Sequence, residues 1–173
     1  LIDTDDDGVA DESKVFAENF NELLDGTAAG IMAFEGKIYF ACIPKIWVLE
    51  DKDGDLVSDE RTVLQDGFGV RVSFSGHDLN GFALGPDGRL YTTIGDRGFN
   101  ITTKEGKTYR YPNQGAILRF ELDGSRMEVV HTGLRNPKEI AFDQFGTGIT
   151  VDNNSDQGDR ARVVFLLEGA DSG

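Results

Sequence analysis

Two short segments of the sequence carry aspartates at positions 1, 3, 5 and 9 of a loop. The aspartates are Asp3, Asp5, Asp7 and Asp11 in the first segment, and Asp51, Asp53, Asp55 and Asp59 in the second. Alternate carboxylates together with a mid-loop backbone carbonyl, from Val9 or Val57, offer the hard oxygen ligands that Ca²⁺ prefers. Without a cation, so many carboxylates would repel one another. The pattern therefore predicts two structural calcium loops, and the alternative is a pair of solvated acidic turns.

The spacing matches the start of an EF-hand loop, but position 12 holds Lys14 or Thr62 in place of the glutamate. The two segments resemble instead the short aspartate-rich loops of thrombospondin-type and dockerin-type repeats, which close with a later aspartate. In either interpretation these loops serve the structure and not the chemistry.

A second group of residues is suited to proton transfer and to binding a carboxylate or a quinone oxygen. Neutral histidine can act as a base near neutral pH, and an arginine fork pairs with planar oxygen groups. The group comprises His77, Asp78, Asp96, Arg97, Arg135, Asn136 and the acidic loop from Asp152 to Asp159. Each member also has a structural alternative. His77 and Asp78 would stabilise a turn, Arg135 would pair with an acid, and residues 152–159 would form a plain loop or a third cation site.

Internal repeats indicate which elements position these residues. Residues 1–20 align with residues 49–68 at an offset of 48, and residues 81–96 align with residues 139–154 at an offset of 58. Each copy of the second repeat reads as a short strand, a glycine turn and a longer strand, and further strand-like runs follow. Four short strands that recur at roughly fifty residues are typical of a β-propeller blade. The sequence therefore predicts an all-β propeller.

We expect a little over three blades in this chain. Residues 1–20 supply an acidic loop and the outermost strand of one blade, residues 30–65 and 81–132 form two complete blades, and residues 138–168 begin another. Closed propellers have about four to eight blades. The remaining blades must therefore lie on other chain segments, or a second copy must cover the open sheet edges.

The blade assignment also sorts the loops between the two ends of the sheets. Connections between blades, and those from the second to the third strand of a blade, lie on one face, so His77, Asp96, Arg135 and residues 152–159 meet at one rim. The aspartate loops lie on the opposite face. Convergent polar groups at such a rim are the default hypothesis for a binding site. The long connection at residues 96–114 is expected to form a lid or wall of this site, or else a solvated hairpin.

The composition limits the partners of the chain. It has 173 residues, of which 39% are hydrophobic and 28% charged, and its formal net charge is −14. A strongly acidic surface repels nucleic acid and anionic membranes, so neither is expected as a partner. Cys42 is the single cysteine and is expected to be buried. No apolar run is long enough to span a membrane. Because the sequence begins inside a loop motif, we expect a processed chain or a fragment.

Three stretches carry a family resemblance: GHDLNGFALGPDGRLYTTIGDRG (76–98), GAILRFELDGSRMEVVHTGLRNPKEIAFD (115–143) and SDQGDRARVVFLLEGADSG (155–173). They resemble the soluble glucose/sorbosone dehydrogenase superfamily and, more narrowly, the membrane-bound dehydrogenase domains of planctomycetes. The resemblance covers nearly the whole chain and implies a six-bladed propeller. It also implies pyrroloquinoline quinone and Ca²⁺ as cofactors in the oxidation of a hydroxyl of a sugar or another polyol.

The resemblance further implies roles for individual residues. His77 matches the general base of the family, and Arg135 is the second expected catalytic residue. The expected cofactor-binding residues are Arg135, Asn136, Asp96, Arg97 and Asp152. Residues 152–159 correspond to the loop that holds the cofactor calcium. The implied electron acceptor is a c-type cytochrome. The implied location is periplasmic or extracellular, with membrane association through segments outside this chain.

A second function class is compatible with the same residues. The chain would then be a non-catalytic propeller, stabilised by calcium, that binds a glycan or a protein partner, for example as a module of a redox complex. Binding of pyrroloquinoline quinone separates the two functions, because only the dehydrogenase requires it.

Overall fold

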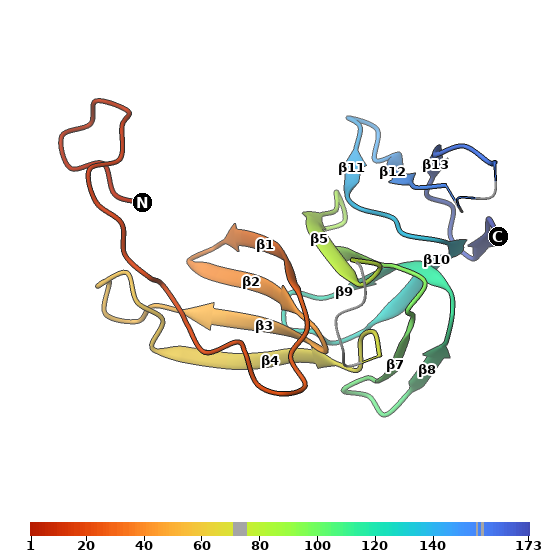
Figure 1. The fold of residues 1–173 in the computed structure, drawn as a ribbon, viewed down its shortest axis with the longest axis horizontal. Coiled ribbons are helices and arrows are strands. Elements are labelled where there is room, and N and C mark those ends of the chain that lie inside the picture. Colours follow the sequence, from red (N-terminus) through yellow and green to blue (C-terminus); the bar gives the residue numbers. More distant parts are fainter. Residues whose placement is uncertain (71–75, 155, 157) are drawn as a thin grey trace.

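A computed structural model describes residues 1–70, 76–154, 156 and 158–173 of the chain. These residues form fourteen β-strands and no helix (Figure 1). The prediction of an all-β chain is therefore confirmed. None of the described segments is a helix long and apolar enough to cross a membrane.

The first sheet consists of four consecutive antiparallel strands. They are β1 (Ala28–Phe34), β2 (Lys37–Cys42), β3 (Lys45–Glu50) and β4 (Glu60–Asp66). The sequence predicted a blade at residues 30–65, within this span. The second aspartate loop joins β3 to β4, at the end of the sheet remote from the β2–β3 turn.

The second sheet has five strands in the order β14-β10-β9-β6-β5. They are β5 (Leu79–Leu84), β6 (Leu90–Ile94), β9 (Gly115–Phe120), β10 (Glu128–Leu134) and β14 (Ala170–Asp171). Strands β5, β6, β9 and β10 are antiparallel, as expected for a blade at residues 81–132. The short β14 returns from the end of the chain and pairs in parallel with β10.

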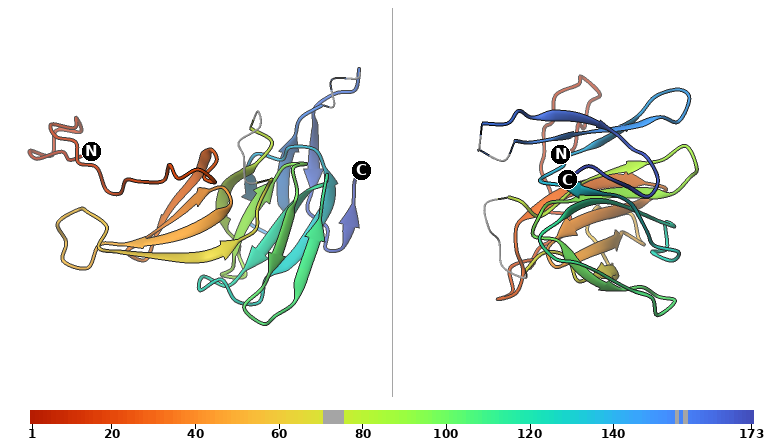
Figure 2. Two further views of the ribbon diagram at one scale, coloured as in Figure 1. Left: turned by 60° about the horizontal axis from the view of Figure 1, so that its bottom comes forward. Right: turned by 90° about the vertical axis from the view of Figure 1, so that its right-hand side faces the viewer.

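The third sheet has three antiparallel strands, which are β11 (Ile140–Phe142), β12 (Gly148–Asp152) and β13 (Arg162–Phe165). One face of this sheet packs on the second sheet. The other face leaves Ile149, Val151, Val163 and Phe165 exposed. The three sheets follow one another in an arc, as Figures 1 and 2 show.

Two buried apolar layers hold the three sheets together. The layer between the first and second sheets includes Ile46, Leu90 and Phe120, each fully buried. The layer between the second and third sheets includes Tyr91 and Ile117. Leu90 and Tyr91 are neighbours on β6, and successive side chains of a strand point to opposite faces. The central strands are therefore buried on both faces, and each large apolar side chain stabilises the fold by about 1.5–3 kcal/mol.

The central part of the connection at residues 96–114 is neither a lid nor a solvated hairpin. It forms a two-stranded sheet, β7 (Phe99–Thr102) and β8 (Thr108–Tyr111), which folds back along the second sheet. Phe99 and Ile101 are only 3% and 0% exposed, because they join the apolar layer between the first two sheets. The hairpin tip is held at the far end of the second sheet, where the Arg126 amide donates to Glu105 at 2.8 Å. Burial of the alternating apolar residues explains why the expectation of a solvated hairpin was wrong. Asp96, Asn113 and Gln114, at the two ends of the connection, line the cavity described below, as expected for a wall.

Residues 1–27 do not form the outermost strand that the sequence predicted within residues 1–20. The segment makes one isolated bridge, between Ile2 and Glu12. Its later part forms no β-ladder. The Phe20 ring meets Phe40 edge-on at 4.7 Å between ring centroids and Trp47 at 5.8 Å, and two backbone hydrogen bonds, from the Ser58 amide to the Phe16 carbonyl and from the Gly26 amide to the Ile43 carbonyl, add to these contacts. The aromatic contacts hold the segment against the first sheet, and it pairs with none of the strands β1 to β4.

The packing of β7 gives a test of the hairpin's role. We expect Ile101→Ala to lower the free energy of unfolding by about 2–4 kcal/mol, because the truncation leaves a cavity between two sheets. Asn100→Ala, on the exposed face of the same strand, is the matched control and should change it by less than about 0.5 kcal/mol. Urea denaturation measures both changes. An equally small change for Ile101→Ala and Asn100→Ala would show that the hairpin does not contribute to the core.

Candidate functional site

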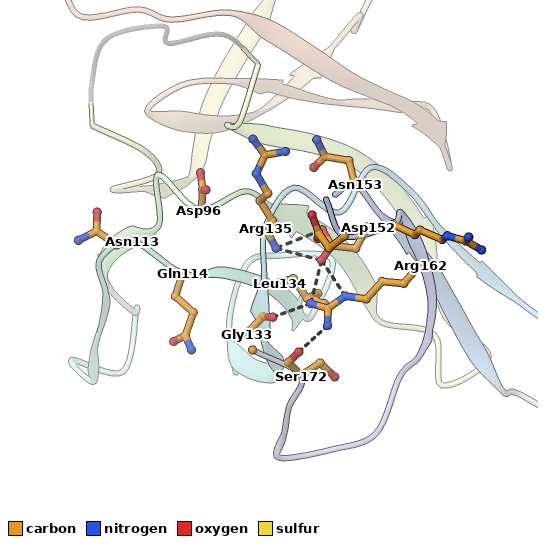
Figure 3. A pocket seen from close by; sticks show the side chains of 13 residues that line it. Asp96, Asn113, Gln114, Gly133, Leu134, Arg135, Asp152, Asn153, Arg162 and Ser172 are labelled. Carbon is orange, nitrogen blue, oxygen red and sulfur yellow. Dashed lines mark hydrogen bonds and ion pairs between the residues drawn. The ribbon is translucent and has the colours of Figure 1, made fainter. Parts of the chain in front are cut away.

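Four loops that are far apart in the sequence meet at one end of the second and third sheets. His77 precedes β5, Asp96 follows β6, Arg135 and Asn136 follow β10, and Asp152 ends β12. Figure 3 shows Asp96, Arg135 and Asp152 around one cavity. The structure therefore brings together the residues that the loop assignment expected at one rim, with His77 beside Asp96 but not among the residues that line the cavity.

His77 and Asp96 form a direct pair. His77 Nδ1 lies 3.0 Å from Asp96 Oδ1, and the two side chains are 15% and 34% exposed. The Asp96 amide donates to the Arg135 carbonyl at 2.6 Å. The chains approach closely here, because a Cβ at Gly95 would lie 2.5 Å from the His77 carbonyl oxygen. Glycine at this position thus lets the histidine loop sit beside the Asp96 turn.

The guanidinium of Arg135 is held by the acidic loop that follows β12. Its Nη2 pairs with Asp156 Oδ2 at 3.0 Å, and its Nη1 donates to the Asn154 carbonyl. The side chain remains 23% exposed. Arg135 is therefore oriented toward the cavity, in contact with part of the loop expected to bind a cofactor cation.

Asn136 and Asp152 are buried beneath Arg135, with 4% and 2% exposure. The Asp152 carboxylate accepts hydrogen bonds from the backbone amides of Arg135 and Asn136, and its Oδ2 pairs with Arg162 at 3.1 Å. Asn136 Oδ1 accepts from Asn80 Nδ2 at 3.4 Å. Both expected cofactor ligands thus have internal partners and support the Arg135 loop from below.

Arg97 and Asp78 differ from the other expected site residues. Arg97 is exposed at the tip of the turn that follows β6 and does not line the cavity. Asp78 is buried, and its backbone carbonyl accepts from the Gly95 amide at 3.0 Å. Asp78 therefore belongs to the base of the loops and not to their open surface.

The cavity has a volume of about 590 Å³. Its lining includes Arg135, Arg160 and Arg162, together with the amide side chains of Asn113, Gln114 and Asn153. Sequence reasoning missed Arg160 and Arg162, whereas the three amides lie in segments that it assigned to the site. The alternation of Arg160 and Arg162 just before the apolar run of β13 is the signal that could have identified them. Asp96, Asp152 and Asp159 line the same cavity, so its three guanidinium groups stand beside three carboxylates.

The aspartate loops lie away from this cavity. In each loop three carboxylate oxygens lie within 4.8 Å of one another, from Asp3, Asp5 and Asp11 in the first loop and from Asp51, Asp53 and Asp59 in the second. The pKa of Asp3 is lowered because its carboxylate accepts from the Gly8 amide, and that of Asp11 because it accepts from the Thr4 hydroxyl and amide. These two carboxylates are therefore charged at neutral pH.

The remaining expected ligands of the two loops have other contacts. Asp7 Oδ1 and Asp55 Oδ1 accept from the amides of Val9 and Val57, each at 2.8 Å. Asp55 Oδ2 also pairs with Lys14 at 3.3 Å. Lys14 therefore links the segment after the first loop to the second loop.

His131 is buried, with 2% exposure, and lies on β10 opposite Ala170 of β14. Its Nδ1 accepts from the Leu167 amide at 3.4 Å, so its Nε2 carries the proton that faces Ser172 Oγ at 2.8 Å. In this tautomer the ring cannot take a proton from Ser172. The pair is a structural contact and not a nucleophile with its base.

The described residues form part of a β-propeller, and the fold is similar to that of two solved sugar dehydrogenase structures. The PQQ domain of pyranose dehydrogenase from Coprinopsis cinerea matches with a TM-score of 0.60 and 17% identity over 92% of this chain and 41% of its own. The PQQ-bound aldose sugar dehydrogenase from Streptomyces coelicolor matches with a TM-score of 0.58 and 20% identity over 79% of this chain and 42% of its own. The prediction of a partial propeller with this resemblance is confirmed for the fold.

The chain belongs to the family of the domain of unknown function DUF7133, whose model matches residues 1–168. It spans 41% and 42% of the lengths of the two dehydrogenase structures, which is less than half. No curated protein sequence matches it.

The burial of His131 predicts a pH dependence of stability. Burial lowers the pKa of His131 below its ordinary value of 6.5, so the unfolded chain binds this proton more readily than the folded chain. Its contribution to stability is fully present above the unfolded pKa and falls as the pH drops below 6.5 toward the folded pKa. We expect the stability difference between wild type and His131→Gln to shrink from about pH 7 to about pH 5 in urea titrations. A pH-independent difference would contradict the assignment.

Proposed function

We propose that this chain is part of a quinone-dependent dehydrogenase that oxidises a hydroxyl of a sugar or another alcohol. The observation that carries the proposal is the His77–Asp96 pair beside the Arg135 loop. In this pair the carboxylate accepts from Nδ1–H and fixes the tautomer in which Nε2 holds the lone pair. A neutral imidazole oriented in this way can remove a proton from a substrate hydroxyl.

His77 is the general base in this proposal. The hydroxyl proton passes to Nε2, and Asp96 stabilises the imidazolium that forms. When bound, pyrroloquinoline quinone supplies the acceptor for the hydride that leaves the carbinol carbon. Arg135 lies next to this pair, because its carbonyl accepts from the Asp96 amide. The base and the arginine are thus fixed relative to each other through one backbone hydrogen bond.

The donors around the cavity could pair with an anionic quinone, in competition with Asp96, Asp152 and Asp159, which also line it. Arg135, Arg160 and Arg162 bring three guanidinium groups to its walls, and Asn113 and Gln114 add neutral donors. Pyrroloquinoline quinone carries several carboxylates and quinone oxygens, which pair with such groups. Asp156 now holds the Arg135 fork at 3.0 Å, so a ligand carboxylate would have to replace it.

We also propose that both aspartate loops bind Ca²⁺ as a structural ion. Two ligands on opposite sides of a Ca²⁺ ion lie about 4.6–5.2 Å apart, and the three clustered oxygens of each loop already lie within 4.8 Å of one another. The second loop joins β3 to β4, so its ion would fix the first sheet. The first loop lies outside the sheets, and its ion would act mainly on residues 1–12.

A second candidate function is that of a non-catalytic propeller that binds a protein. The exposed apolar face of β12 and β13, with Ile149, Val151, Val163 and Phe165, favours it, because contiguous apolar surface marks interaction sites. Titration with pyrroloquinoline quinone in the presence of Ca²⁺ separates the two functions. Saturable binding supports the dehydrogenase, and its absence supports the second candidate.

The role of His77 gives the direct test of the proposed chemistry. In the full-length protein supplied with quinone and an artificial electron acceptor, His77→Gln should lower kcat by about 10²–10⁴-fold over a panel of aldoses, because the base is lost. Asp96→Asn should cause a smaller loss, since it removes only the orientation of the ring. Asn100→Ala is the control and should retain full activity. Wild-type kcat in the His77 variant would rule out this base.

Removal of calcium gives a separate test of the loops. If each ion is near saturation, chelation with EDTA should lower the Tm by about 5–10 °C. Asp51→Asn should remove most of this calcium-dependent shift, and Asp3→Asn a smaller part. Asp143→Asn, in a turn outside both loops, should keep the full shift. Identical melting curves with EDTA and with Ca²⁺ would identify the loops as acidic turns.

A further inference from the structure

The carboxylate of Asp152 is a buried charge directly under the proposed site. Its side chain is 1% exposed. It accepts from the amide of Arg135 at 3.0 and 3.1 Å and from the amide of Asn136 at 2.7 Å. Two consecutive backbone donors therefore converge on one side chain from a neighbouring sheet.

Arg162 balances this charge and grips the same backbone segment. Its Nε and Nη2 donate to Asp152 Oδ2 at 3.3 and 3.1 Å, its Nη2 also donates to the Gly133 carbonyl at 3.0 Å, and its Nη1 donates to the Ser172 carbonyl at 2.6 Å (Figure 3). Asp152 thus binds the amides after β10, while Arg162 binds a carbonyl before them. Together they hold the four residues from Gly133 to Asn136 at both ends.

The backbone at Gly133 allows this grip. Its φ is +74°, and a Cβ there would lie 1.9 Å from Asp171 Oδ1 and 2.2 Å from the Gly173 nitrogen. A larger residue would push the end of the chain away from β10 and displace the carbonyl that Arg162 binds. Both ends of the segment Gly133–Asn136 therefore contact the ion pair. The Gly133 carbonyl binds Arg162, and the amides of Arg135 and Asn136 bind Asp152.

Stability alone does not explain an ion pair in which the Asp152 side chain is 1% exposed while that of Arg162 is 43% exposed. A well-packed apolar pair of similar volume is commonly as stable, because the Asp152 carboxylate must be removed from water. An apolar pair could not bind consecutive backbone amides, however. The specific effect of Asp152 and Arg162 is to fix the backbone of Arg135, and with it the direction in which the guanidinium leaves the loop.

We propose that Asp152 and Arg162 are positioning residues that hold Arg135 in its binding orientation at the cavity. The backbone part of this proposal is independent of the ligand. Its consequence for quinone binding rests on the proposed function.

Asp152→Asn is the first test, because an amide keeps the shape but replaces one acceptor oxygen by a donor. The amide protons of Arg135 and Asn136 should then exchange about 10- to 100-fold faster in NMR measurements, as expected when a charged acceptor is lost. Amides of β9 should keep their protection. Asp143→Asn is the matched control, since Asp143 also accepts from two backbone amides, Phe145 and Thr147, each at 2.8 Å. It should release those two amides and leave Arg135 unchanged.

Arg162 gives the second test. Arg162→Lys keeps a charge beside Asp152 but cannot reach all its partners, so Arg135 exchange should lie between wild type and Arg162→Met. In full-length protein that binds pyrroloquinoline quinone, the Kd should rise in the same order, by about tenfold for Asp152→Asn. Local release of Arg135 with weaker quinone binding supports the proposal.

Four other results are distinguishable. Unchanged exchange at Arg135 and Asn136 in Asp152→Asn overturns the proposal, and so does faster exchange throughout the second sheet, which would indicate a merely structural role. Local release with unchanged quinone affinity in the variants also overturns the assigned orientation role. If the wild type binds no quinone, local release still supports the backbone part, and only the proposed function fails.

Discussion

The whole arrangement depends on the burial of each sheet against the next. The second sheet is the centre of this packing, because its strands β6 and β9 send alternate side chains into opposite apolar layers. Leu90 and Phe120 face the first sheet, while Tyr91 and Ile117 face the third. This two-sided burial fixes the distance between the sheets, and therefore also the distance between the loops at their ends. His77, Asp96 and Arg135 therefore meet because of residues that have no polar chemistry.

Much of the fold could be predicted from the sequence, since strand periodicity and glycine turns are local features. The hairpin at 99–111 could not, because the alternation of Phe99 and Ile101 is the same in a solvated hairpin and in one that packs on a core. Residues 1–20 show the converse problem. Their similarity to residues 49–68 is real in the sequence, but a strand also needs a neighbour, and Phe20 instead packs on the side chains of β2 and β3.

The sequence predicts which residues gather at the candidate site, but not which of them face the cavity and which are buried beneath it. Arg135, Asn136 and Asp152 all carry functional groups suited to a ligand, and sequence reasoning treated them alike. Burial separates them, because Arg135 faces the cavity while Asn136 and Asp152 are committed to internal partners. Arg162 was missed because its role is to compensate a charge that lies ten residues earlier in sequence and across a β-ladder. Such compensation becomes visible only when burial is known.

The short strand β14 has a mechanical consequence for the third sheet. The chain leaves the second sheet after β10, runs through the third sheet, and returns to pair His131 with Ala170 and Thr132 with Asp171 on the outer edge of β10. The third sheet is therefore attached to the second both where the chain enters it, after β10, and where the chain leaves it, at β14. The sheet cannot swing outward unless the β14–β10 pairing and the Arg162 contacts break together. The wall of the cavity that carries Arg160 and Arg162 is accordingly a fixed wall.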